Sequence, residues 1–148
     1  MRINELSFRS GKEAIAKHPE IHASIFAAIV NAQEAQLKSP RVSIEKRLQR
    51  ELLAESWTRS KKNLLFLKKR IALHTEFSHY EFVYRDLLQL LVAHSADKID
   101  VGVILTNTTA GSRRVKQKFN GSHFDRVCSE LERLRPAFPV PIWVIGLR

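Results

Sequence analysis

Residues 70–77 alternate in type and carry the side chains best suited to chemistry. Arg70, His74 and Glu76 fall on one face if this segment is a β-strand, because successive side chains of a strand point to opposite faces. An imidazole nitrogen and a carboxylate oxygen at such positions can bind a divalent metal ion, and nitrogen suits Mn²⁺, Zn²⁺ or Ni²⁺ better than Mg²⁺. The pattern predicts a metal site of His74 and Glu76, with Arg70 or Lys69 beside it.

An upstream helix offers further carboxylates to such a site. Glu51 and Glu55 lie four residues apart, so they share a helix face and either could add an oxygen ligand. The alternative interpretation is an ordinary solvated or salt-bridged strand face, in which His74 pairs with Glu76 or with an aromatic ring. Both interpretations stay open on the residue pattern alone.

The elements that would position these side chains can be read from hydrophobic periodicity. A capping box at Ser10 and Glu13 predicts a first helix, which Pro19 either stops or follows as a first-turn residue of the second. The second helix ends at residues 38–40, and Ser43 caps a third. A β-hairpin follows, with strands at residues 63–67 and 70–77 joined through Lys68 and Lys69. The rest of the chain predicts a helix, a strand, a helix and a strand: residues 82–94, 99–105, 124–134 and 142–147. Strand–helix–strand units imply an α/β protein whose sheet is at least partly parallel.

Length and composition narrow the class of protein. A chain of 148 residues with 44% hydrophobic residues predicts one globular domain, residues 1–148. No apolar run approaches the length needed to cross a bilayer, and no secretory signal is evident, so we expect no membrane partner. Cys128 is the only cysteine, which excludes an internal disulfide and fits a reducing cytoplasm.

Charge is the most informative bulk property. The formal net charge is +10, which favours polyanionic partners such as DNA or RNA. Residues 38–70 carry a net charge of +8 and residues 106–148 a net charge of +5, and between them residues 71–105 carry −3. Two basic zones around an acidic, apolar middle suit a surface that grips a nucleic-acid backbone.

Two groups of basic residues are candidates for contacting DNA, and the alternative for each is an ordinary solvated surface. The first lies in a polar loop at residues 106–122 and comprises Arg113, Arg114, Lys116 and Lys118. Arginine can pair bidentately with guanine, whereas lysine mostly contacts phosphate. The second group surrounds the hairpin and comprises Lys61, Lys62, Lys68, Lys69 and Arg70.

The chain resembles type II restriction endonucleases of the BglII and BstYI kind, which have the PD-(D/E)xK nuclease fold. The order of elements matches the core of that fold. Five short stretches resemble the family in the same order: residues 17–21, 42–46, 70–77, 99–103 and 140–146. Ile-Asp-Val-Gly-Val at residues 99–103 is the most specific of these. The likeness implies a restriction-endonuclease-like α/β/α sandwich with N-terminal helices, a β-hairpin and a mixed central sheet.

The resemblance also implies a homodimer that binds palindromic double-stranded DNA and cuts it with a divalent metal, Mg²⁺ or Mn²⁺. The family's metal-binding Asp falls at Leu65, its strand Glu falls at His74, and its following Glu or Gln falls at Glu76. Loss of the Asp removes the main Mg²⁺ ligand, so at this point we favour the solvated or salt-bridged strand face.

Three hypotheses for function follow from the residues and the resemblance. The preferred one is a DNA-binding family member whose cleavage is weak or lost, a pseudoenzyme without a cofactor. The second is an active endodeoxyribonuclease with an altered His/Glu metal site. The third is a protein-interaction module that uses the apolar helix at residues 82–94 or a dimer face, its basic charge being incidental.

Overall fold

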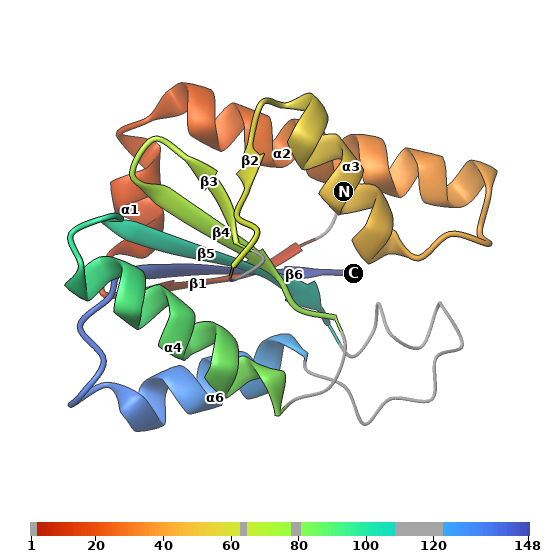
Figure 1. Cartoon of the computed structure of the whole chain (residues 1–148). Coiled ribbons are helices and arrows are strands. Elements are labelled where there is room, and N and C mark those ends of the chain that lie inside the picture. Colours follow the sequence, from red (N-terminus) through yellow and green to blue (C-terminus); the bar gives the residue numbers. More distant parts are fainter. Residues whose placement is uncertain (1–2, 63–64, 78–80, 109–122) are drawn as a thin grey trace.

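The computed structural model describes residues 3–62, 65–77, 81–108 and 123–148 (Figure 1). In chain order the elements are β1 (Ile3–Phe8), α1 (Gly11–Ala16), α2 (Pro19–Lys38), α3 (Ile44–Ala54), β2 (Thr58–Arg59), β3 (Phe66–Lys68), β4 (Ile71–Thr75), α4 (Phe82–Ser95), β5 (Val101–Asn107), α6 (Phe124–Leu134) and β6 (Ile142–Leu147). The predicted order of helices, hairpin and alternating elements is confirmed, and β1 and β2 are two further strands.

The strands form one six-stranded sheet in the order β1-β6-β5-β4-β3-β2. β4, β5 and β6 run parallel, whereas β1, β3 and β2 are added antiparallel at the two sides. Helices α4 and α6 connect the parallel strands, as crossover connections require. Lys68 pairs with Ile71, so Lys69 and Arg70 form the two-residue turn of the hairpin. Lys69 has a left-handed φ of 54°, which suits a tight hairpin turn.

Helices cover both faces of the sheet, so the predicted α/β/α sandwich is confirmed (Figure 1). On one face α1, α2 and α3 bury side chains against strand residues such as Leu73, Val103 and Trp143. On the other face α4 and α6 pack against Ala72, Ile104 and Val144. Alternate side chains of these strands therefore pack into two separate hydrophobic cores, one on each face of the sheet.

The predicted helix starts are mostly confirmed. Ser43 accepts a hydrogen bond from the backbone N–H of Lys46 at 3.3 Å, and Pro19 occupies the first turn of α2. The capping box at Ser10 is wrong, because Ser10 takes a left-handed conformation and its side chain caps nothing. Glu13 instead accepts a hydrogen bond from Ser7, which belongs to the unpredicted strand β1.

Within the described part of the chain, no helix combines the length and the apolar character that a bilayer crossing requires.

Candidate metal centre

Three buried side chains meet where β4 ends, and we call them the His–carboxylate cluster: His74, Glu76 and Asp86. They are 6%, 2% and 2% exposed. Each offers one potential ligand atom, and these atoms all lie within 4.8 Å of one another. Nδ1 of His74 and Oδ2 of Asp86 are 3.2 Å apart. One nitrogen and two carboxylates at this spacing form a donor set that a single cation could bridge.

The strand supplies two members of the cluster. His74 pairs with Ile104 in the register of β4 and β5, and the backbone N–H of Glu76 donates to the carbonyl of Leu105 at 2.8 Å. The backbone of β4 therefore stays held against β5 just beyond Thr75. His74 and Glu76 share the face that Ala72 presents to α4, as the alternation of the sequence predicted.

Helix α4 supplies Asp86, and a glycine lets the helix approach the sheet. Leu90 lies one turn after Asp86 and packs over Gly102 of β5. A Cβ on Gly102 would lie 2.6 Å from the side chain of Ile142 and 3.1 Å from that of Leu90. Because any larger residue would push these side chains away, Gly102 helps set the distance at which Asp86 reaches His74.

One carboxylate oxygen of Asp86 is held by Arg85, and the other oxygen points toward His74. Its Oδ1 accepts a hydrogen bond from Nε of Arg85 at 3.1 Å, and Nη2 of Arg85 forms an ion pair with the same oxygen at 3.0 Å. Its Oδ2 and the Nδ1 of His74 are buried and have no hydrogen-bond partner among the described residues. The two atoms lie 3.2 Å apart, so one proton or one cation between them would satisfy both. A cation would satisfy both, so the residues present fit a metal ion.

The charge states of the cluster follow from its burial. Burial lowers the pKa of His74 to about 4, more than the nearby Glu76 carboxylate raises it, so the imidazole is neutral with a free lone pair. Burial and the neighbouring Glu76 carboxyl group raise the pKa of Asp86 to about 8. The contact of His74 with Asp86 is thus between neutral groups when no cation is bound, and a cation would displace the Asp86 proton.

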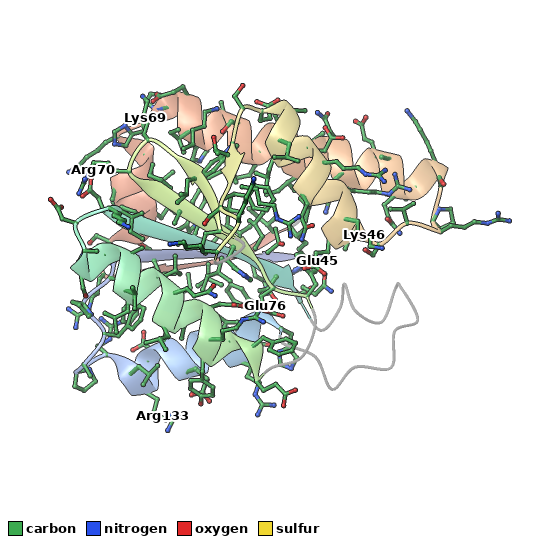
Figure 2. The ribbon with its side chains drawn as sticks, in the orientation of Figure 1. Glu45, Lys46, Lys69, Arg70, Glu76 and Arg133 are labelled. Atoms are coloured by element: carbon green, nitrogen blue, oxygen red, sulfur yellow. The ribbon has the colours of Figure 1, made fainter. Side chains whose placement is uncertain are left out.

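A fourth carboxyl group comes from the first turn of α3. Burial and the charge of Glu76 raise the pKa of Glu45, against a hydrogen bond from Thr75 that lowers it. Gln49, one turn further along α3, donates to the Thr75 hydroxyl at 3.2 Å. Glu45 and Glu76 lie on the same side of the molecule in Figure 2, at the end of β4. Helix α3 therefore adds Glu45 to the surroundings of the cluster.

Glu51 and Glu55, the carboxylates predicted to join the metal site, lie toward the end of α3 that is far from the cluster. Helix α3 presents Glu45 to the end of β4, whereas the carbonyl of Glu55 accepts a hydrogen bond from Lys68 at the hairpin, 2.6 Å away. At about 1.5 Å per residue, Glu51 and Glu55 lie roughly 9 and 15 Å further along the chain direction than Glu45. The cluster that the described residues form contains neither of them.

Arg70 is likewise separated from His74 and Glu76. It lies at the start of β4, where it pairs with Asp97 at 2.6 Å and Asp100 at 2.9 Å. Four residues of strand, about 13 Å, separate it from His74. The expectation that Arg70 or Lys69 lies beside the cluster is therefore wrong: strand alternation puts Arg70 on the right face but at the opposite end (Figure 2).

Leu65 stands where the resemblance expected a metal-binding Asp. It is fully buried in the core between the sheet, α4 and α6. The pairing of Phe66 with Leu73, continued by one residue, places Leu65 across from His74. The hairpin position next to His74 is thus apolar, and the second carboxylate of the cluster comes from α4 instead.

The basic residues predicted around the hairpin divide between the two ends of the sheet. Lys61 and Lys62 are exposed in the turn that joins β2 to β3, at the end where β4 finishes. Lys68 and Lys69 lie at the other end, where Lys69 pairs with Glu20. The loop candidates lie outside the described residues: Arg113, Arg114, Lys116 and Lys118.

Asp86, Glu45, Arg59 and Arg85 are site residues that sequence reasoning missed. Arg59 and Arg85 lie close enough to lower the pKa of His74, and Arg59 and Lys46 act similarly on Glu45. One signal could have found Asp86: it lies on the apolar stripe of α4 between Val83 and Leu90. An acid on a buried helix face is rare unless it is paired or binds a cation.

Comparison with known proteins places this architecture in a family. The family model for restriction endonuclease BglII/BglIII matches residues 3–147. The crystal structure of BglII complexed with a DNA 16-mer superposes with a TM-score of 0.77 at 17% identity, covering 99% of this chain and 76% of that one. Free BglII gives a TM-score of 0.74 at 18% identity, covering 100% and 80%. No curated protein matches the chain. The chain belongs to the BglII/BglIII restriction endonuclease family.

Proposed function

We propose that this protein binds double-stranded DNA and cleaves it in a reaction that depends on a divalent metal ion held by the His–carboxylate cluster. The observation that carries the proposal is the convergence of His74, Glu76 and Asp86 within 4.8 Å. The sequence favoured lost cleavage, because Leu65 stands where the resemblance places the family's metal-binding Asp. Asp86 brings a carboxylate to the same place from α4, so the geometry favours the active enzyme over the binding pseudoenzyme.

Binding to DNA is supported by the family, by the charge and by the surroundings of the cluster. The structural neighbour BglII is complexed with DNA. The net charge of +10 supplies sequence-independent attraction to phosphates. Arg59, Lys46, Lys61 and Lys62 lie at the end of the sheet that holds the cluster. Of the loop residues, Arg113 and Arg114 remain the candidates for pairing with guanine, and Lys116 and Lys118 the candidates for contacting phosphate. A homodimer on a palindromic site and a cytoplasmic location complete the proposal, both resting on the family likeness.

The roles of the side chains follow from their donors and their charges. A bound divalent ion would neutralise charge developing on the phosphate and lower the pKa of an attacking water. Neutral His74 offers a nitrogen lone pair, while Glu76 and Asp86 offer carboxylate oxygens. Arg85 fixes the orientation of Asp86 through its other oxygen. Glu45 adds a carboxyl group near Glu76, and burial together with the Glu76 charge raises the pKa of this group, which suits a role in proton transfer.

A supercoiled-plasmid assay tests this proposal. The protein is incubated with plasmid in Mn²⁺, in Mg²⁺ and in EDTA, and Glu76→Gln serves as the matched variant. We expect discrete fragments with a divalent metal, which disappear in EDTA and in the variant while duplex binding persists in a gel shift. Plasmid that stays intact in both metals, together with salt-sensitive duplex binding, would show that binding is retained without cleavage.

A further inference from the structure

The donor set of the His–carboxylate cluster differs from an all-oxygen magnesium site. We infer that His74, Glu76 and Asp86 bind a first-row transition-metal ion of the Mn²⁺ or Co²⁺ class in preference to Mg²⁺. This inference rests on the proposed function only in making that ion the cofactor for cleavage, since the binding itself requires no DNA.

The spacing of two donors already suits one shared ion. Ligands held about 2.1 Å from a metal, at octahedral or tetrahedral angles, lie about 3.0 to 3.4 Å from each other. Nδ1 of His74 and Oδ2 of Asp86 are both buried and lie 3.2 Å apart. A carboxylate oxygen of Glu76 completes the group within 4.8 Å. Ligands about 2.1 Å from one ion are at most about 4.2 Å apart, so a bound ion would draw this carboxylate closer to the other two donors.

The groups behind the donors hold them in place. Arg85 binds Oδ1 of Asp86 at 3.0 Å, which leaves Oδ2 to point toward His74. The pairing of β4 with β5 fixes the backbone on both sides of His74 and Glu76. Partners of this kind orient metal ligands and typically change metal affinity by about 10- to 100-fold when removed. The Asp86 carboxylate and the backbone of His74 and Glu76 are therefore held in place before an ion binds.

Two features of the His–carboxylate cluster favour Mn²⁺ or Co²⁺ over Mg²⁺. Mg²⁺ prefers oxygen ligands and gives up its hydration shell reluctantly, whereas imidazole binds later first-row ions more strongly. Leu65 removes the oxygen ligand that the hairpin could have offered beside His74. The three cluster side chains are at most 6% exposed, so an ion among them must lose most of its water. Both features penalise Mg²⁺ more than Mn²⁺ or Co²⁺.

Direct binding measurements on the whole protein, without DNA, test the inference. Mn²⁺ binding is followed by electron paramagnetic resonance with Mg²⁺ as competitor, and Co²⁺ binding by visible absorption. The test variants are His74→Gln and Asp86→Asn. Asp97→Asn is the matched control, because Asp97 is an exposed acid at the end of the same helix and its φ of 56° suits asparagine.

We expect one Mn²⁺ to bind at least about tenfold more tightly than Mg²⁺. Each test variant should weaken Mn²⁺ binding by about tenfold or more, and the control should bind as the wild type does. His74→Glu should narrow the preference by restoring an all-oxygen set. Equal affinity for the two ions, or Mn²⁺ binding that His74→Gln leaves unchanged, would overturn the inference.

The design also keeps this inference separate from the proposed function. If a variant fails to fold, the competition and the Co²⁺ spectrum of the wild type still decide the metal preference. Tight Mn²⁺ binding without plasmid cleavage would sustain the metal site and contradict the nuclease. Cleavage that runs equally well on Mg²⁺, with no preference in binding, would sustain the nuclease and contradict the selectivity.

Discussion

Oδ2 of Asp86 lies 3.2 Å from Nδ1 of His74, although one residue belongs to a helix and the other to a strand. Across the hairpin from His74 stands Leu65, where a family member is expected to carry its metal-binding Asp. The contact shows how a carboxylate can reach this position without the hairpin. It also makes Asp86 the residue whose replacement should separate DNA binding from DNA cleavage.

Replacing Asp86 should abolish cleavage and spare binding. Asp86→Asn keeps the side-chain volume and removes a negatively charged ligand, so we expect plasmid cleavage in Mn²⁺ to fall by about a hundredfold or more. Duplex affinity in EDTA should stay within about twofold, since Asp86 is buried. Asp97→Asn should cleave like the wild type. Equal loss of binding and cleavage would indicate that Asp86 supports the fold rather than the site.

The same variant should make the metal-free protein more stable than the wild type as the pH rises from 5 to 8. Burial raises the pKa of Asp86 to about 8, so the folded chain retains a proton that the unfolded chain loses above about pH 4. The free energy of unfolding from this group therefore falls as pH rises toward 8, and Asp86→Asn removes that loss. Urea denaturation in EDTA should show the variant gaining on the wild type by up to about 1.4 kcal/mol per pH unit between pH 5 and 8. Parallel pH profiles would contradict this account of the cluster.

The two ends of α3 should differ in their effect on cleavage. Glu45 lies beside Glu76 and Thr75, so Glu45→Gln should lower the cleavage rate, by about tenfold, and change its pH profile. Glu55 lies at the hairpin end, where its backbone carbonyl binds Lys68, so Glu55→Gln should leave the rate unchanged. Initial cleavage rates across pH 6 to 9 provide the measurement. A larger loss in Glu55→Gln than in Glu45→Gln would place the site at the other end of the helix.

The two halves of the basic hairpin group should contribute differently to DNA binding. Lys61 and Lys62 are exposed at the end that holds the cluster, so replacing both with alanine should reduce the salt slope of duplex binding by about 1 to 2. Lys69 pairs with Glu20 at the opposite end, so Lys68→Ala with Lys69→Ala should leave the slope unchanged. Fluorescence anisotropy between about 50 and 200 mM salt measures both. A salt slope reduced only by the Lys68→Ala and Lys69→Ala variant would indicate that DNA binds at the hairpin end of the sheet.

Local sequence patterns were sufficient for much of the fold. The parallel strands β5 and β6, the hairpin and helices α2, α3, α4 and α6 all have clear periodicity, and strand alternation correctly put His74 and Glu76 together. β1 was missed because its burial alternates weakly and its partner β6 lies at the other end of the chain. β2 has only two residues, which leaves no pattern to detect.

The candidate site was only half predictable for a similar reason. Strand periodicity gives the face of a side chain but says little about which helix packs opposite or which end of that helix is near. Arg70 therefore looked like a neighbour of His74, although Asp97 and Asp100 hold it at the far end of β4. Glu51 and Glu55 were chosen over Glu45 because the direction of α3 across the sheet is a tertiary property. Asp86 requires the packing of α4 over Gly102, which no local pattern encodes.

The most direct test of the metal centre is anomalous diffraction from crystals of the protein grown or soaked with Mn²⁺. We predict an anomalous peak at about 2.1 to 2.3 Å from Nδ1 of His74, Oδ2 of Asp86 and a carboxylate oxygen of Glu76. The same peak should be absent from Asp86→Asn crystals under identical conditions. A peak elsewhere, or none at Mn²⁺ concentrations that support plasmid cleavage, would contradict the assignment of these three residues as the metal site.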